Sequence, residues 1–125
     1  MNMFKQLFVI GLGGAIGSIF RYLVQLAISS MFTLVFPLGT FVANVSGCFI
    51  IGLLYAVFEK YAGLGFEWRL FLITGLCGGY TTFSSFSFES VTLFKQGDYF
   101  YFFSYVILSV VFSLLATLLG MILLR

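Results

Sequence analysis

Residues 75–89 read GLCGGYTTFSSFSFE, and this stretch decides how the chain folds. It lies in an apolar segment, yet it is crowded with glycine and with hydroxyl-bearing Ser and Thr, and it ends in the acid Glu89. Unsatisfied backbone N–H and C=O groups are costly in hydrocarbon. Backbone loosened by glycine therefore persists at membrane depth only where protein buries it or where it lines a wet cavity. The stretch predicts a functional site.

The composition indicates an integral membrane protein. Of the 125 residues, 62% are hydrophobic and 8% are charged, whereas a soluble domain of this size needs far more charged surface. The net charge of +2 is too small to indicate nucleic-acid binding. Cys48 and Cys77 lie in apolar runs, and the chain has no histidine. We interpret both cysteines as small buried residues and not as a metal pair.

Charges and turn residues predict one all-α transmembrane domain that covers residues 1–125. From Tyr22 to Phe58 the chain carries no charge. This run is too long for one span of about 20 residues, and Pro37 with Gly39 marks the break in it. Four such helices hardly enclose a solute path alone, so we expect a homo-oligomer. The predicted transmembrane helices lie at about residues 4–30, 39–58, 68–94 and 99–124.

The third predicted helix contains the opening stretch, and we expect it to be broken near mid-membrane. Gly75, Gly78 and Gly79 precede Thr81 and Thr82 there, a pattern that interrupts a helix. A broken helix offers its free N–H groups to anions and its free carbonyls to cations. The break is therefore a candidate cation site.

Two aromatic residues, Phe83 and Phe86, follow the break three positions apart, so they share a helix face. Packing is the ordinary role of phenylalanine, but the electropositive edges of its ring also suit the route of an anion. Ser84 and Ser85 add hydroxyl donors. The absence of Lys and Arg from residues 70–94 favours a weak, multi-site path over a fixed cationic trap.

Further polar side chains lie on the second and fourth helices. Thr40 and Asn44 are four positions apart and share a face of the second helix. The Asn44 amide suits an anion or a neighbouring helix, and the spacing leaves both interpretations open. On the fourth helix a row of hydroxyls predicts a face turned to a polar path or to the other helices. This row consists of Tyr105, Ser109, Ser113 and Thr117.

The first and third helices each carry a charge. Arg21 lies well inside the first predicted span, where it either snorkels to the interface or serves a vestibule on the anion's side. Glu89 comes late in the third span, and its role stays open. In the first helix, Gly13 and Gly17 predict close packing against another helix.

These residues resemble the Fluc family of fluoride channels, also called CrcB. The resemblance covers the whole chain and rests on residues 75–89, on Gly39-Thr40-Phe41-Val42-Ala43-Asn44, and on Gly14-Ala15-Ile16-Gly17 followed by Arg21. It implies a dual-topology homodimer of antiparallel subunits in the cytoplasmic (inner) membrane of a prokaryote. Two pathways along the interface would let cytoplasmic fluoride leave passively and so lower its toxicity. Such conduction needs no catalytic site, so we do not expect an enzyme.

The resemblance also implies which residues act. Backbone carbonyls of Gly78 and Thr81 from both subunits would hold one structural Na⁺ at the dimer interface. Arg21 and Glu89 are candidates for a vestibule. The fluoride pathway would be formed by Phe83, Phe86, Asn44, Thr40, Ser84, Ser85, Tyr105 and Ser109.

Two other functions compete with conduction. A small multidrug-type proton-coupled exporter shares the size and the four spans, but it needs a membrane-embedded carboxylate, normally in the first helix. The first helix here has none, and Glu89 lies in the third. The second alternative is a structural membrane subunit that transports nothing and uses its polar faces to hold helices together.

Overall fold

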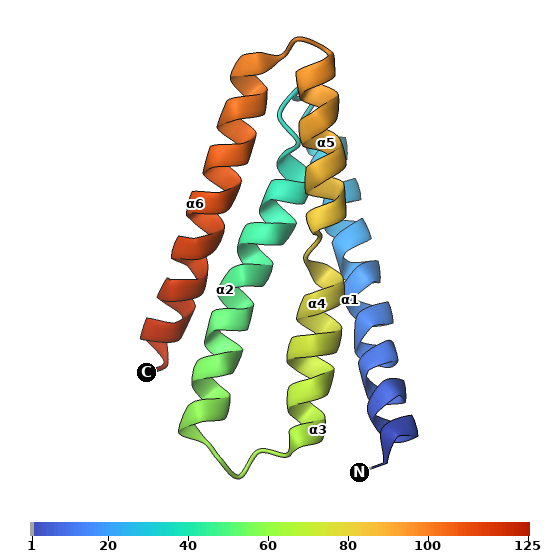
Figure 1. The fold of residues 1–125 in the computed structure, drawn as a ribbon, viewed down its shortest axis with the longest axis vertical. Helices are drawn as coiled ribbons and strands as arrows, with labels where there is room; N and C mark the ends of the chain where they lie inside the picture. The colour runs from blue at the N-terminus through green and yellow to red at the C-terminus, as the bar shows by residue number, and fades with distance from the viewer. Residues whose placement is uncertain (1) are drawn as a thin grey trace.

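The computed structural model describes residues 2–125, and its regular elements in that range are all helical. The chain runs up and down through four antiparallel rods, and both termini lie at the same end of the molecule (Figure 1). Three rods are single helices, whereas the third is built from successive segments. In chain order the elements are α1 (Met3–Met31), α2 (Leu38–Lys60), α3 (Phe66–Arg69), the π-helical η1 (Leu70–Cys77), α4 (Gly78–Tyr80), α5 (Phe83–Lys95) and α6 (Tyr99–Leu123).

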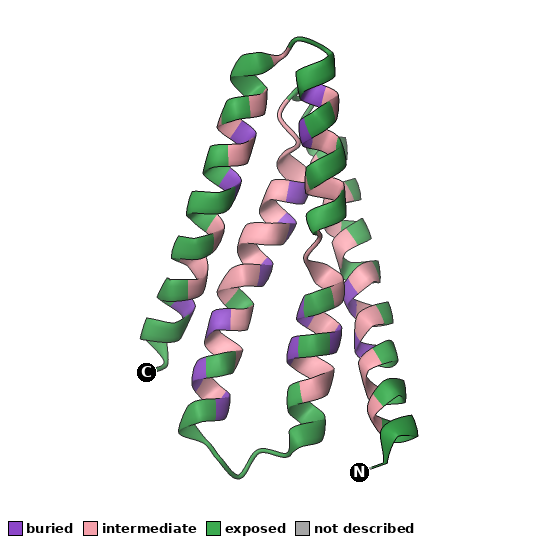
Figure 2. Cartoon of the chain, in the orientation of Figure 1, coloured by how far each residue is buried: buried purple, intermediate pink, exposed green. Residues whose placement is uncertain are grey.

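The outer surface of the molecule is apolar. Large hydrophobic side chains are exposed along the whole lengths of α1 and α6, and Figure 2 shows how little of either helix is buried. Soluble proteins rarely expose apolar surface of this extent. The helices α1, α2 and α6 are each long and apolar enough to cross a membrane. The chain is therefore a multi-pass membrane protein.

The third rod packs against α1 through glycine. A Cβ atom on Gly13 would lie 2.5 Å from the carbonyl oxygen of Phe71, and one on Gly79 would lie 2.5 Å from the carbonyl oxygen of Gly14. A Cβ atom on Gly17 or Gly75 would also lie within 3 Å of backbone across the same seam. Only residues without a side chain allow two helix backbones to approach so closely. The close packing predicted for the first helix is confirmed.

The central helix is α2, which packs against α6 along most of its length and also contacts α1 and η1. Gly52 and Gly120 face backbone across the α2–α6 seam. The buried residues of α2 recur on the faces turned to its neighbours. They are Thr40, Ala43, Gly47, Gly52, Ala56 and Phe58.

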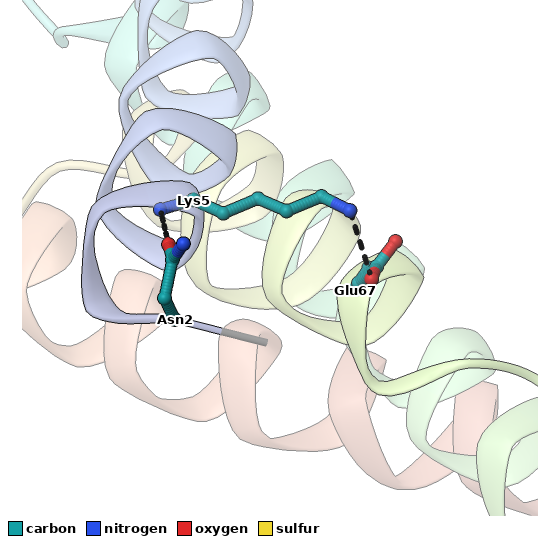
Figure 3. Close-up of polar contacts among 3 residues, drawn as sticks. All are labelled: Asn2, Lys5 and Glu67. Carbon is teal, nitrogen blue, oxygen red and sulfur yellow. Dashed lines mark hydrogen bonds and ion pairs between the residues drawn. The ribbon is translucent and has the colours of Figure 1, made fainter.

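The ends of the rods follow from local chemistry. Pro37 precedes the first residue of α2, at the break that the sequence predicts. Gly97 has a φ of +80° in the turn before α6, a conformation that favours glycine. At the opposite end, the Asn2 side chain accepts a hydrogen bond from the Lys5 amide, and Lys5 Nζ lies 3.4 Å from Glu67 Oε1 (Figure 3). Both charges are half exposed, so this pair adds little stability.

Candidate functional site

The third rod is interrupted about midway along the molecule (Figure 1). Helix α4 ends at Tyr80, the backbone of Thr81 and Thr82 is extended, and α5 begins at Phe83. Asn44 of α2 bridges this gap with both ends of its amide. Its Nδ2 donates to the Thr82 carbonyl over 3.0 Å, and its Oδ1 accepts from the Thr82 amide over 2.7 Å. The side chain thus supplies the partners that Thr82 would find inside a helix.

Because Asn44 bridges the break, the Gly78 carbonyl lacks the hydrogen bond of a continuous helix. In a continuous helix the Thr82 amide would donate to the Gly78 carbonyl four residues earlier, but here Asn44 accepts that proton. Gly78 is exposed, and a Cβ atom on it would meet only the Ile73 carbonyl oxygen, 3.8 Å away. No other helix of the subunit requires a glycine at this position. Gly78 therefore lies on an open face of the subunit.

Backbone oxygens at the break suit a hard cation, for which neutral carbonyl ligands are appropriate. The Gly78 carbonyl has lost its helical donor to Asn44. Thr81 directs both its amide and its hydroxyl to the Cys77 carbonyl, each over 3.0 Å, which fixes the backbone next to its own carbonyl. These two carbonyl groups are compatible with the predicted Na⁺ site, which stays a prediction.

A cavity of about 260 Å³ lies beside the break. It contains four of the predicted pathway residues, together with residues to which the sequence assigned no site. The hydroxyl of Ser109 is buried there and has no hydrogen-bond partner within residues 2–125. A buried polar atom without a partner is costly and uncommon. The lining residues are Asn44, Cys48, Thr81, Thr82, Phe83, Phe86, Ser109, Val110 and Ser113.

The two phenylalanines differ in their surroundings. Their ring centroids are 5.6 Å apart, as their spacing on one helix face predicts. Phe86 is partly buried and also contacts Tyr105, with centroids 5.1 Å apart. Phe83 is 78% exposed, so most of its ring has no contact within the subunit. Large exposed rings of this kind are typical of surfaces that another protein or lipid covers.

A second and larger cavity, of about 410 Å³, lies between the end of α1, the α1–α2 connection and α5. Thr40 and Glu89 line it. Thr40 Oγ1 donates to Glu89 Oε2 over 2.9 Å, and the Tyr105 hydroxyl donates to Glu89 Oε1 over 3.0 Å. Thr40 and Tyr105 are almost completely buried. The only acid inside the bundle, within the described chain, is thus held by two hydroxyl donors.

Tyr105 connects the two cavities. Its hydroxyl binds Glu89 at the larger cavity, and its ring packs on Phe86, which lines the smaller one. Ser109 follows one turn later on α6, as the predicted hydroxyl row requires. The hydrogen-bonded groups therefore form one polar line from Thr40 through Glu89 to Tyr105, and the Tyr105 ring contacts Phe86 at the smaller cavity.

Three predicted residues lie elsewhere. Ser84 Oγ lies 3.2 Å from the Thr82 hydroxyl, and the Ser85 amide donates to that hydroxyl at the start of α5. Neither serine lines either of the two cavities. Arg21 Nε donates to the Gly79 carbonyl over 3.2 Å, at the end of α4. A cation suits the negative end of a helix, so Arg21 stabilises the break from the side of α1.

Sequence reasoning missed two polar contacts. Gln25 of α1 donates from Nε2 to Thr40 Oγ1 over 3.0 Å, and it lines the larger cavity. It lies one turn beyond Arg21, and this i, i+4 spacing was available as a signal. The hydroxyl of Tyr80 lies 2.9 Å from Ser46 Oγ of α2. Nothing in the spacing of these two residues pointed to that contact.

The chain is similar in sequence to known proteins over nearly its whole length. The chain is 46% identical over 118 residues to the fluoride-specific ion channel FluC of Flavobacterium psychrophilum, covering 94% of this chain and 95% of that protein. It is 45% identical over 111 residues to FluC of Leptospira interrogans, covering 89% and 87%. FluC of Phocaeicola vulgatus is 47% identical over 116 residues, covering 93% and 95%. The family model described as CrcB-like protein, Camphor Resistance (CrcB), matches residues 8–121, so the chain belongs to the CrcB family.

Proposed function

We propose that this protein is a passive, fluoride-selective anion channel. The observation that carries the proposal is the buried, unpartnered hydroxyl of Ser109 in a cavity shared with Asn44, Phe83 and Phe86. A free donor in such a place suits a small anion that has shed water. Relatives similar over nearly the whole chain are named fluoride-specific ion channels. That naming supports the choice of fluoride.

Conduction also requires that the anion leave. The residues that line the two cavities include no lysine and no arginine. Donors along the path are neutral hydroxyls and ring edges, which replace water without holding the ion as a fixed cation would. An interior-negative membrane potential favours expulsion of a monovalent anion by about 2.3 kcal/mol per 100 mV. Net export of cytoplasmic fluoride then needs no further energy source.

The proposed assembly is a homodimer of antiparallel subunits in the inner membrane of a prokaryote. Its support is the open face of the subunit, where Phe83 is exposed and Gly78 has no neighbouring helix. A second copy would cover Phe83 and close the smaller cavity. In that arrangement the Gly78 and Thr81 carbonyls of both subunits would hold one structural Na⁺. The relatives compared above are bacterial, which supports the location.

A fluoride-efflux assay tests the proposal. Purified protein is reconstituted into liposomes loaded with potassium fluoride, valinomycin starts the release, and a fluoride electrode follows it. We expect rapid release that does not depend on a proton gradient, and much slower release from liposomes loaded with chloride. Release that requires a proton gradient would favour the exporter. No release from correctly folded protein would favour the structural subunit.

A further inference from the structure

Gln25 has no role in the pathway described above, yet it contacts the polar line at its buried end. Its Nε2 donates to Thr40 Oγ1 over 3.0 Å. The contact exists because Gly39 lacks a side chain. A Cβ atom on Gly39 would lie 3.1 Å from Gln25 Cα and 3.3 Å from the Gln25 carbonyl oxygen. The first turn of α2 thus approaches the α1 backbone at the one residue whose amide reaches Thr40.

With Glu89 ionised, one order of the protons in this array satisfies every contact. The Thr40 hydroxyl has a single proton and lies between the Gln25 amide and the Glu89 carboxylate. An ionised carboxylate only accepts hydrogen bonds, so the Thr40 proton must point to Glu89. Gln25 must then present its N–H to the remaining lone pair of Thr40. Tyr105 gives its own proton to the other carboxylate oxygen.

We propose that Gln25 is a positioning residue that fixes the Thr40 proton on Glu89 and so holds this carboxylate in place at the wall of the larger cavity. Thr40 is 2% exposed, so its hydroxyl has little access to water while Gln25 is in place. Without Gln25, the Thr40 hydroxyl still donates to Glu89, but it loses the donor that holds its oxygen in place, so its hydrogen bond to Glu89 weakens. The less tightly held carboxylate then carries its negative charge into the cavity, where it repels an anion. This last consequence rests on the proposed function, whereas the hydrogen-bond order does not.

Infrared spectroscopy of the carboxylate stretch tests the hydrogen-bond order without any transport measurement. The band of Glu89 is identified as the one that disappears in Glu89→Gln. Gln25→Leu removes the amide donor and keeps a side chain of similar size. Gln25→Glu replaces the donor with an acceptor that competes for the Thr40 proton. The matched control is Gln6→Leu, because Gln6 lies on the same helix and its side chain makes no hydrogen bond within residues 2–125.

We expect the Glu89 band to shift in Gln25→Leu, to shift further in Gln25→Glu, and to stay unchanged in Gln6→Leu. An unchanged band in Gln25→Leu protein that remains monodisperse would overturn the proposal. Fluoride efflux adds a second readout. The loss of one hydrogen bond predicts about a fivefold slower efflux in Gln25→Leu than in Gln6→Leu. Equal efflux from these two variants would remove the functional part of the inference.

The two measurements also distinguish failure of this inference from failure of the proposed function. If the wild-type protein releases no fluoride, channel function is wrong, and the infrared spectra still decide whether Gln25 orders the array. If the wild type conducts fluoride but the Glu89 band is unchanged in Gln25→Leu, channel function is supported and the positioning role of Gln25 is wrong.

Discussion

The two halves of the third rod are held in opposite ways. Before the break, η1 and α4 lie against α1 with backbone on backbone, at spacings that exclude even a methyl group at Gly79. After the break, α5 has few backbone neighbours, and side-chain hydrogen bonds through Thr82 and Glu89 fix it to α2 and α6. Close steric fit therefore holds η1 and α4 in place, whereas side-chain hydrogen bonds hold α5.

This difference predicts two kinds of sensitivity. Substitutions before the break should act through size, because backbone atoms cannot move aside. Substitutions after the break should act through the gain or loss of a donor, and they should affect the passage of an ion as well as the fold.

Gly79→Val should have the largest effect. Its Cβ atom would lie 2.5 Å from the carbonyl oxygen and 3.0 Å from the Cα of Gly14. Overpacking of this kind against rigid backbone should cost at least about 3 kcal/mol of stability. Heating followed by size-exclusion chromatography measures the surviving folded fraction. Gly11→Val is the matched control, since nothing lies within 4 Å of a Cβ atom there. Equal survival of the two variants would contradict the steric account.

Asn44→Ala tests the bridge across the break. The variant removes both hydrogen bonds to Thr82 and leaves its amide and carbonyl without partners inside the bundle. The unpaired backbone should lower stability by about 2 kcal/mol. The same heating assay applies, with the exposed Ser87→Ala as control. An Asn44→Ala variant as stable as wild type would mean that the break does not need its bridge.

The number of helices, and the place where the third is interrupted, could be predicted from the sequence because they depend on local features. Uncharged runs, Pro37 and the clustered glycines near Gly79 act over a few residues each. The partners of these features could not be predicted. The Asn44 amide was interpreted as a hydrogen-bond donor to an anion or to a neighbouring helix, and both ends of it in fact bind Thr82. That pairing depends on how α2 packs, which no local pattern encodes.

The same limit explains the candidate site. The hydroxyl row on α6 was visible as a four-residue repeat. The structure brings Ser109 and Ser113 to the smaller cavity and the Tyr105 hydroxyl to Glu89. By contrast, the hydrogen bonds among Gln25, Thr40 and Glu89 join residues from three different rods, so no pattern within one helix predicts them. They follow only when the close approach at Gly39 is known.

Phe86→Ile separates passage of the ion from stability. Isoleucine keeps most of the apolar volume but removes the ring that contacts Phe83 and Tyr105. Fluoride efflux should fall by about tenfold or more if the ring edge provides a station for the anion. Phe83→Ile should also reduce efflux, while Phe88→Ile, at an exposed position of α5 outside both cavities, should not. Undiminished efflux in both Phe83→Ile and Phe86→Ile would eliminate the aromatic path.

Ser109→Ala should change stability least, and it is informative because stability and efflux should change in opposite directions. The hydroxyl is buried and has no hydrogen-bond partner among residues 2–125, so its removal relieves a desolvation cost and should raise thermal stability by about 1 kcal/mol. If the same hydroxyl serves the anion, efflux must fall while stability rises. Packing alone cannot produce opposite signs, because a residue that only supports the fold loses both together. Ser90→Ala is the control, since that buried hydroxyl already donates to the Phe86 carbonyl and its loss should lower stability. Stability and efflux that both fall in Ser109→Ala would assign Ser109 to the fold and remove it from the pathway.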